Sequence, residues 1–183
     1  VVFDCSAKYR GQSLNGHLLQ GPDLTNNLVG ILLRFRKDKV AVSCDIKSMF
    51  HQFRVHRGDR DYLRFFWYGD GGKIVPYRMN VHLFGAASSP SCSNFGLKAL
   101  ASDHESSHPS AAKFVKENFY VDDGLISVPS SQAAIDLIDQ TRDLCSKGGL
   151  ILHKFVTNND NVSQHLNISD SPEVKLPDSA CTI

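Results

Sequence analysis

Two adjacent carboxylates interrupt an apolar stretch of the chain. Asp122 and Asp123 stand between residues 119–121 (Phe-Tyr-Val) and residues 124–126 (Gly-Leu-Ile). The aromatic and aliphatic residues on both sides predict two strands, and the turn between them puts both carboxylates at the tip of a hairpin, with Gly124 in the strained backbone conformation. Two neighbouring anions are costly to bury unless cations offset them. The pattern therefore predicts a rigid tip that holds divalent metal ions.

A third carboxylate ends another predicted strand. Residues 39–46 (Lys-Val-Ala-Val-Ser-Cys-Asp-Ile) alternate and are rich in valine, which is typical of a buried strand, and Asp45 lies at its end. If this strand lies beside the hairpin, three carboxylates meet at one end of a sheet, where they suit Mg²⁺ together with substrate phosphates. Two such ions support in-line phosphoryl transfer. Taken alone, an Asp-Asp-Gly segment is more often just an ordinary hairpin turn.

The elements that position these carboxylates predict an α+β domain, with helices on one face of a largely antiparallel sheet. We expect strands at residues 1–5, 39–46, 62–68, 73–79 and 150–156 and in the hairpin at 119–128. Helices are expected at 88–103, 111–117 and 131–147, together with one that Asp23 or Thr25 caps and that runs to about residue 36. Residues 47–53 are expected to form a tight turn or a single helical turn. We expect one domain over residues 1–157. Residues 158–183, rich in Asn, Ser, Asp and Pro, are expected to form a disordered tail.

The composition narrows the possible classes of protein. Of 183 residues, 42% are hydrophobic and 21% are charged, as in ordinary globular domains. The formal net charge of +1 neither supports nor excludes a nucleic-acid partner. Five cysteines without a Cys-x-x-Cys pair indicate neither a zinc site nor a disulfide framework. No apolar run is long enough to cross a membrane, so no membrane partner is expected. Because the chain begins at Val1 without a methionine, we expect it to be part of a longer protein.

Three segments together resemble LTR-retrotransposon reverse transcriptases. Residues 44–53 (Cys-Asp-Ile-Lys-Ser-Met-Phe-His-Gln-Phe) resemble the motif that carries the first catalytic aspartate of these enzymes. Residues 120–123 (Tyr-Val-Asp-Asp) resemble their Tyr-x-Asp-Asp box, and residues 84–90 (Phe-Gly-Ala-Ala-Ser-Ser-Pro) are similar to the segment between the two. More narrowly, the segments that resemble the Pao/BEL group are residues 1–15, 19–27, 77–84 and 149–155. The resemblance spans residues 1–157 and implies a polymerase palm with part of the fingers.

The resemblance implies an RNA-directed DNA polymerase that uses two Mg²⁺ or Mn²⁺ ions. Asp45 and Asp122 would be the principal metal ligands, with Asp123 as the third carboxylate and the carbonyl of Ile46 as a further oxygen ligand. The 3′-hydroxyl of a primer would attack the α-phosphate of a bound dNTP. Lys154 would lie near the leaving pyrophosphate, as a general acid or as a counter-charge. Without the resemblance, Lys154 is equally a solvated lysine at a strand end.

The resemblance also implies how the nucleotide and the template are contacted. The ring of Phe50 would fill the space of a ribose 2′-hydroxyl and so select deoxynucleotides. Without the motif, Phe50 is more simply interpreted as a core aromatic residue. Phe84 and Gly85 would lie against the incoming nucleotide, where glycine permits close approach of the backbone. Gln52 and Tyr120 would face nucleic acid.

The implied partners are an RNA or DNA template with its primer, a dNTP, and the remainder of a Pol polyprotein (thumb, RNase H and integrase). We expect a cytoplasmic location, including virus-like particles, with the nucleus as an alternative. In relatives, a basic residue of the fingers that holds the triphosphate precedes the position matched by Asp4 and falls outside this chain. The alternative function is therefore a catalytically inactive retroelement remnant that acts only as a weak nucleic-acid-binding or structural module. A metal-dependent phosphohydrolase is the third possibility.

Overall fold

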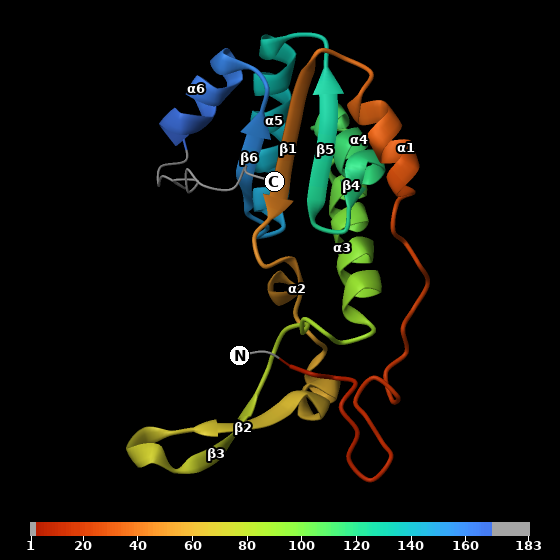
Figure 1. The fold of residues 1–183 in the computed structure, drawn as a ribbon, viewed down its shortest axis with the longest axis vertical. Helices are drawn as coiled ribbons and strands as arrows, with labels where there is room; N and C mark the ends of the chain where they lie inside the picture. Colours follow the sequence, from red (N-terminus) through yellow and green to blue (C-terminus); the bar gives the residue numbers. More distant parts are fainter. Residues whose placement is uncertain (1–2, 170–183) are drawn as a thin grey trace, which may run out of the picture.

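The structure is a computed structural model that describes residues 3–169. Its elements are, in chain order, α1 (Leu28–Phe35), β1 (Val40–Ile46), α2 (Met49–Gln52), the 3₁₀ helix η1 (Arg57–Leu63), β2 (Arg64–Tyr68), the 3₁₀ turn η2 (Asp70–Gly72), β3 (Ile74–Arg78), α3 (Ser89–Asp103), α4 (Pro109–Asn118), β4 (Phe119–Tyr120), β5 (Asp123–Val128), α5 (Ser131–Lys147), β6 (Leu152–Thr157) and α6 (Asp160–Ser169). The molecule is elongated, with the larger sheet and its helices at one end and the β2–β3 hairpin projecting at the other (Figure 1). None of the described helices is both long and apolar enough to span a membrane.

The larger sheet has the strand order β4-β5-β1-β6, and all neighbouring strands are antiparallel. Along β1, buried residues alternate with half-buried ones. This period of two arises because successive side chains of a strand point to opposite faces, and only one face of this sheet lies on helices. The structure therefore confirms the predicted α+β class with an antiparallel sheet.

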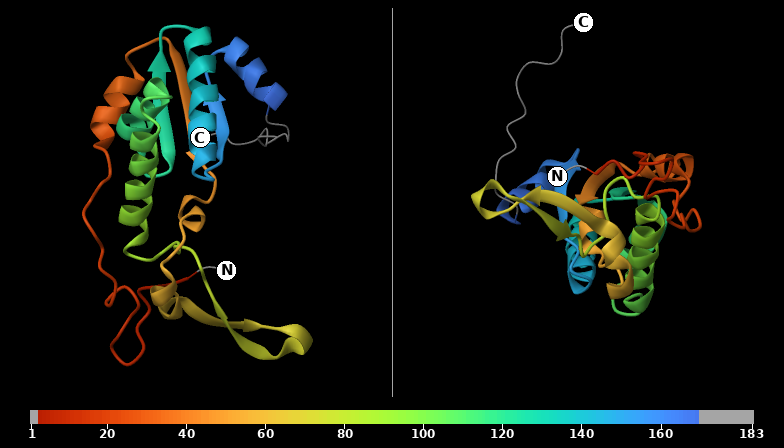
Figure 2. Two further views of the ribbon diagram at one scale, coloured as in Figure 1. Left: turned by 180° about the vertical axis from the view of Figure 1, so that it is seen from behind. Right: turned by 90° about the horizontal axis from the view of Figure 1, so that it is seen from below.

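Helices α3, α4 and α5 form the layer behind the sheet in Figure 1, and the reverse view in Figure 2 shows them in front of it. Their apolar faces close the core against β1 and β5. The members of this core with no more than 1% of their surface exposed are Ile46, Met49, Leu97, Ala101, Ala111, Ala112, Val115, Phe119, Leu144 and Cys145. Burial of these apolar side chains is the main stabilising contribution to such a domain. It also holds the sheet rigidly, so that side chains on its open face and at the ends of its strands have fixed positions.

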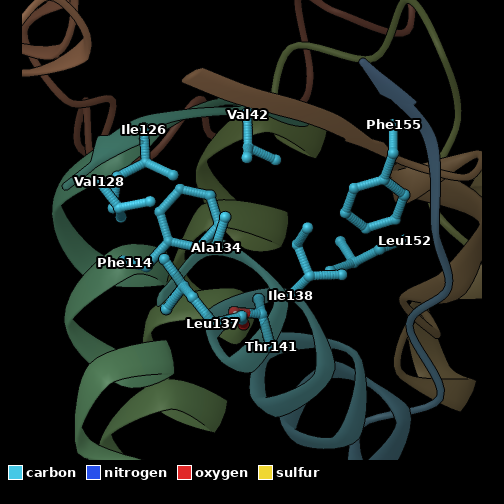
Figure 3. Close-up of a pocket in the computed structure, with 10 residues that line it drawn as sticks. All are labelled: Val42, Phe114, Ile126, Val128, Ala134, Leu137, Ile138, Thr141, Leu152 and Phe155. Carbon is cyan, nitrogen blue, oxygen red and sulfur yellow. The ribbon is translucent and has the colours of Figure 1, made fainter. Parts of the chain in front are cut away.

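A small void of about 10 Å³ lies between the sheet and α5 (Figure 3). Its lining is apolar apart from Thr141, whose hydroxyl already donates to the carbonyl of Leu137 at 2.6 Å. A space this small, without free polar partners, holds neither water nor a ligand. The covered face of the sheet is therefore structural, and any chemistry belongs to the open face or to the ends of the strands.

Two predictions about the ends of the chain are wrong for the described residues. Residues 3–5 form no strand, because the Asp4 carboxylate accepts hydrogen bonds from the backbone N–H groups of Ser6 and Ala7 and bends the chain into a turn. Residues 160–169 are not a disordered tail but helix α6. Val162 and Leu166 of this helix are buried in a cluster with β1 and α5, and this apolar contact orders the segment. Residues 1–2 and 170–183 lie outside the described part of the chain.

The first helix begins later than expected. α1 starts at Leu28, and the side chain of Asn27 caps it by accepting from the N–H of Gly30 at 3.0 Å. The preceding residues are extended because they are hydrogen-bonded to other elements: Asn26 donates to the carbonyls of Lys116 and Phe119. These long-range contacts override the local tendency of the segment to form a helix.

Candidate active site

The three predicted carboxylates lie at one end of the larger sheet. Asp45, the penultimate residue of β1, pairs directly with Asp123, the first residue of β5. Asp122 precedes Asp123 in the turn between β4 and β5, and its carbonyl accepts a hydrogen bond from the N–H of Ile46 at 3.0 Å. This bond fastens the hairpin tip to the end of β1, so the three acidic side chains are held on rigid backbone.

The strained residue of this turn is Val121, not Gly124 as predicted. Val121 has φ +58°, which is unusual for a β-branched residue and costs on the order of 1–3 kcal/mol. Gly124 lies inside β5, where it pairs with Phe119 and Cys44. A Cβ atom on Gly124 would lie 2.6 Å from Cζ of Phe119 and 3.0 Å from Sγ of Cys44. Close packing therefore requires glycine at position 124. The strained backbone conformation is that of Val121, which precedes Asp122 in the turn between β4 and β5.

The electrostatics of the tip follow from this crowding. Partial burial raises the pKa of the Asp123 carboxyl, and the negative charges of Asp122 and Asp45 raise it further. The ammonium group of Lys154 acts in the opposite direction and lowers it. The three carboxylates thus repel one another, and bringing a cation to the tip relieves that repulsion.

Asp45 is held by two side chains of the adjacent strand β6. Nε2 of His153 donates to Oδ1 of Asp45 at 2.6 Å, and Nζ of Lys154 lies 3.0 Å from Oδ2. The structure thus brings Lys154 to the carboxylates, and its predicted place near a leaving pyrophosphate stays a prediction. His153 was not identified from the sequence, because its contact joins residues 108 apart and depends on which residue of β6 pairs with Asp45.

The carboxylates have the right chemistry for a hard divalent cation, since Mg²⁺ and Mn²⁺ are bound through oxygen. Within residues 3–169, no group of three or more His, Cys, Asp or Glu side chains is arranged to hold a metal ion. Both carboxylate oxygens of Asp45 are instead hydrogen-bonded to β6. The donor set therefore fits a divalent cation, but Asp45 must release at least one of its two contacts with β6 to join it.

The predicted nucleotide-contacting residues also come together. The ring centroids of Phe50 and Phe84 lie 4.8 Å apart, and His51 meets Phe84 edge-on at 5.0 Å. Phe84 is 45% exposed, which is high for an aromatic ring of this size. Gly85 has φ +96°, and a Cβ atom there would lie 2.7 Å from the carbonyl oxygen of Phe3. Gly85 therefore allows a close backbone approach, but the approach observed is to the N-terminal segment, and the expected approach to a nucleotide stays a prediction.

Asn15 holds the loop that carries Gly85, a role that was not predicted from the sequence. Its Nδ2 donates to the carbonyl of Gly85 at 3.0 Å, and its Oδ1 accepts from the N–H of Ala87 at 2.8 Å. Both contacts bridge about seventy residues of chain. One amide side chain thus satisfies two backbone groups of the loop and fixes its position.

The two residues predicted to face nucleic acid occupy different surroundings. Tyr120 is 38% exposed and pairs with Asp123 across the hairpin, so it lies beside the carboxylates. Nε2 of Gln52 donates to the carbonyl of Lys47 at 3.1 Å and closes the turn that carries Phe50. A separate hollow of about 500 Å³ lies between the N-terminal loop, η1 and the start of α3, and none of the predicted site residues lines it.

Comparisons with known proteins support the fold but not a family. No protein-family model matches the chain, and no curated protein matches it. Among solved structures, a foamy viral protease–reverse transcriptase (dRH) in complex with double-stranded DNA is similar, with a TM-score of 0.63 at 16% sequence identity. The match covers 82% of this chain and 23% of that chain. The fold is therefore reverse-transcriptase-like, and the chain spans less than a quarter of this neighbour.

Proposed function

We propose that this chain is the palm, with part of the fingers, of an RNA-directed DNA polymerase that belongs to the Pol polyprotein of a Pao/BEL-type LTR retrotransposon. The observation that carries the proposal is the convergence of Asp45, Asp122 and Asp123 at one end of the sheet, in a fold like that of a reverse transcriptase. The Pao/BEL assignment is supported by the residues of the chain alone, chiefly residues 1–15 and 149–155.

The proposed reaction would take place at the three carboxylates. Asp45, Asp122 and Asp123, with the carbonyl of Ile46, would hold two Mg²⁺ or Mn²⁺ ions, which supply charge neutralisation and activation of the primer 3′-hydroxyl when bound. The hydrogen bond from Ile46 to the Asp122 carbonyl keeps the tip from moving relative to β1. Lys154, whose ammonium group lies 3.0 Å from Asp45, would neutralise or protonate the leaving pyrophosphate.

The aromatic rings of Phe50 and Phe84 would contact the incoming nucleotide. Phe50 follows Asp45 by five residues on the helical turn that leaves β1, and its ring would exclude a ribose 2′-hydroxyl. Phe84 is exposed enough to stack on a base. Gly85 would let the backbone of its loop approach the nucleotide closely. Tyr120 and Gln52 would contact the nucleic acid.

The proposed partners are an RNA or DNA template with its primer, a dNTP, and the thumb, RNase H and integrase of the same polyprotein. The foamy viral neighbour was solved with double-stranded DNA, which is consistent with a nucleic-acid partner. The proposed location is the cytoplasm, including virus-like particles, with the nucleus as the alternative.

Primer extension tests the proposal. The chain, alone and within its polyprotein, is supplied with a primed RNA template, dNTPs and Mg²⁺ or Mn²⁺, and we expect templated incorporation that Asp122→Asn abolishes. The matched control is Asp136→Asn, because Asp136 is an exposed aspartate on α5 that accepts only from Gln132 among the hydrogen bonds described. Equal incorporation by the Asp122→Asn protein would contradict the assignment of the carboxylates.

The second candidate is an inactive remnant that binds nucleic acid without extending it. It is favoured by one observation, namely that the described side chains include no ready-made metal-binding group. Template binding by the wild-type polyprotein, measured by fluorescence anisotropy, with no incorporation under any divalent cation would establish this candidate over the polymerase.

A further inference from the structure

We propose that His153 and Lys154 form a clamp on Asp45 in which Lys154 occupies the place of a divalent cation and is displaced when the cation binds, while His153 holds the carboxylate in both states. The proposal rests on the proposed function, because it requires Asp45 to be a metal ligand. It adds a positioning residue, His153, and an exchange of partners for Lys154.

The first support is the way in which two consecutive residues reach the same carboxylate. Neighbouring side chains of a strand normally point to opposite faces. Here Ser43 pairs with Val156 and Asp45 pairs with His153, so three steps along β6 oppose two steps along β1. This β-bulge inserts one extra residue into β6 and redirects a side chain. Lys154 and His153 can therefore both contact Asp45 from one strand.

The second support is backbone strain at the bulge. Lys154 has φ +51°, a left-handed conformation that costs a non-glycine residue roughly 1–2 kcal/mol. Strain of this kind is retained where the surrounding structure requires it, and it clusters at functional sites. Nothing at this position demands a lysine for packing, since its side chain is 65% exposed. The strained residue of the bulge is thus the one that brings an ammonium group to Asp45.

The two clamp residues differ in how easily each releases the Asp45 carboxylate. Lys154 is mostly exposed and carries a flexible side chain, and exposed ion pairs of this kind are weak. The His153 side chain is 30% exposed, Asp45 is 22% exposed, and their contact is short at 2.6 Å. A carboxylate oxygen has two lone pairs, so Oδ1 can keep the His153 hydrogen bond while Oδ2 turns to a cation. Lys154 is therefore the partner that a divalent cation replaces.

The exchange has a direct consequence for the proposed reaction. As long as Lys154 is paired with Asp45, its ammonium group is not available to a leaving pyrophosphate. With a divalent cation bound to Asp45, the ammonium group of Lys154 would be free to contact a leaving pyrophosphate beside the tip. The clamp also offsets part of the repulsion among the carboxylates before the cation arrives, because Lys154 acts on Asp123 as well.

Metal affinity tests the clamp without relying on catalysis. Mn²⁺ is titrated into metal-free protein, and free Mn²⁺ is followed by electron paramagnetic resonance. Lys154→Met removes the competing charge but keeps an unbranched side chain, and we expect it to tighten Mn²⁺ binding about two- to fivefold, the equivalent of one exposed ion pair. The matched control is Lys147→Met, since Lys147 pairs with Asp143 on α5 at 2.9 Å. The Mn²⁺ affinity of the Lys147→Met protein should equal that of the wild type.

The histidine variants separate positioning from simple folding. His153→Leu should weaken Mn²⁺ binding several-fold, because Asp45 loses the donor that orients it. His153→Gln keeps an N–H donor and should restore most of the affinity. Mn²⁺ binding that Lys154→Met leaves unchanged or weakens would overturn the clamp while leaving the proposed metal site intact. No Mn²⁺ binding by the wild type at millimolar concentrations would overturn the metal site of the proposed function and the clamp with it.

Discussion

Gly124→Ala should destabilise the protein, although the same substitution usually has the opposite effect at an unstrained position. Gly124 does not have a positive φ, so alanine fits its backbone conformation. Reduced freedom of the unfolded chain alone would then stabilise the fold by about 0.4–1 kcal/mol. The added Cβ, however, would lie 2.6 Å and 2.8 Å from two ring atoms of Phe119.

The size of the loss follows from how little the neighbours can move. Phe119 is 1% exposed and Cys44 is 3% exposed, so neither can turn away into solvent. Overpacking of a well-filled core typically costs about 1–3 kcal/mol, which exceeds the entropic gain. We expect a net loss of about 1–2 kcal/mol, or roughly 2–8 °C in Tm for a chain of this size.

Urea denaturation followed by circular dichroism measures this loss. Gly30→Ala is the matched control, because Gly30 lies inside α1 and its added Cβ would come no closer than 3.4 Å to the flexible Arg34 side chain. That control should be stabilised by about 0.5–1 kcal/mol. Phe119→Leu should reduce the cost of Gly124→Ala, since it removes the ring atoms that the new methyl group meets. A Gly124→Ala protein as stable as the wild type, or an equal cost with and without the Phe119 ring, would refute the packing argument.

Three further predictions test the selection of deoxynucleotides by Phe50, the docking of α6 and the repulsion among the carboxylates of the tip. Phe50→Val should lower the preference for deoxynucleotides over ribonucleotides on the order of tenfold or more in single-nucleotide incorporation, and unchanged sugar discrimination would exclude this role of Phe50. Val162→Ala should lower the free energy of unfolding by about 1–3 kcal/mol, measured in urea, because Val162 is fully buried, and no change would mean that α6 is not docked. Asp123→Asn should raise Tm at neutral pH in metal-free buffer, because a raised pKa means that the folded state disfavours the ionised carboxylate. That gain should vanish as the pH falls below the ordinary carboxyl pKa, and its absence at neutral pH would count against repulsion at the tip.

The local sequence pattern was sufficient to predict most of the helices and strands. The helix over residues 131–147 has the predicted bounds, because its apolar stripe, its Ser130 cap and the glycines that follow it are all local signals. Strand β1 and the hairpin β2–β3 were also predicted to within two residues, since alternation and turn residues are local as well. The α6 helix was missed because its polar composition suggests disorder, whereas its contacts with α5 and β6 order it.

The sequence by itself determined which residues could do chemistry. Asp45, Asp122 and Asp123 stand at predicted strand ends, and their convergence required only that two predicted strands be neighbours. Tertiary structure alone decided which backbone position carries the strain, with Val121 in the turn and Gly124 packed beneath a ring. It also decided that His153 and Lys154 share one carboxylate, because a bulge depends on the pairing of strands more than a hundred residues apart. Residue types and their spacing are local properties, whereas register, close packing and charge pairing exist only after distant segments meet.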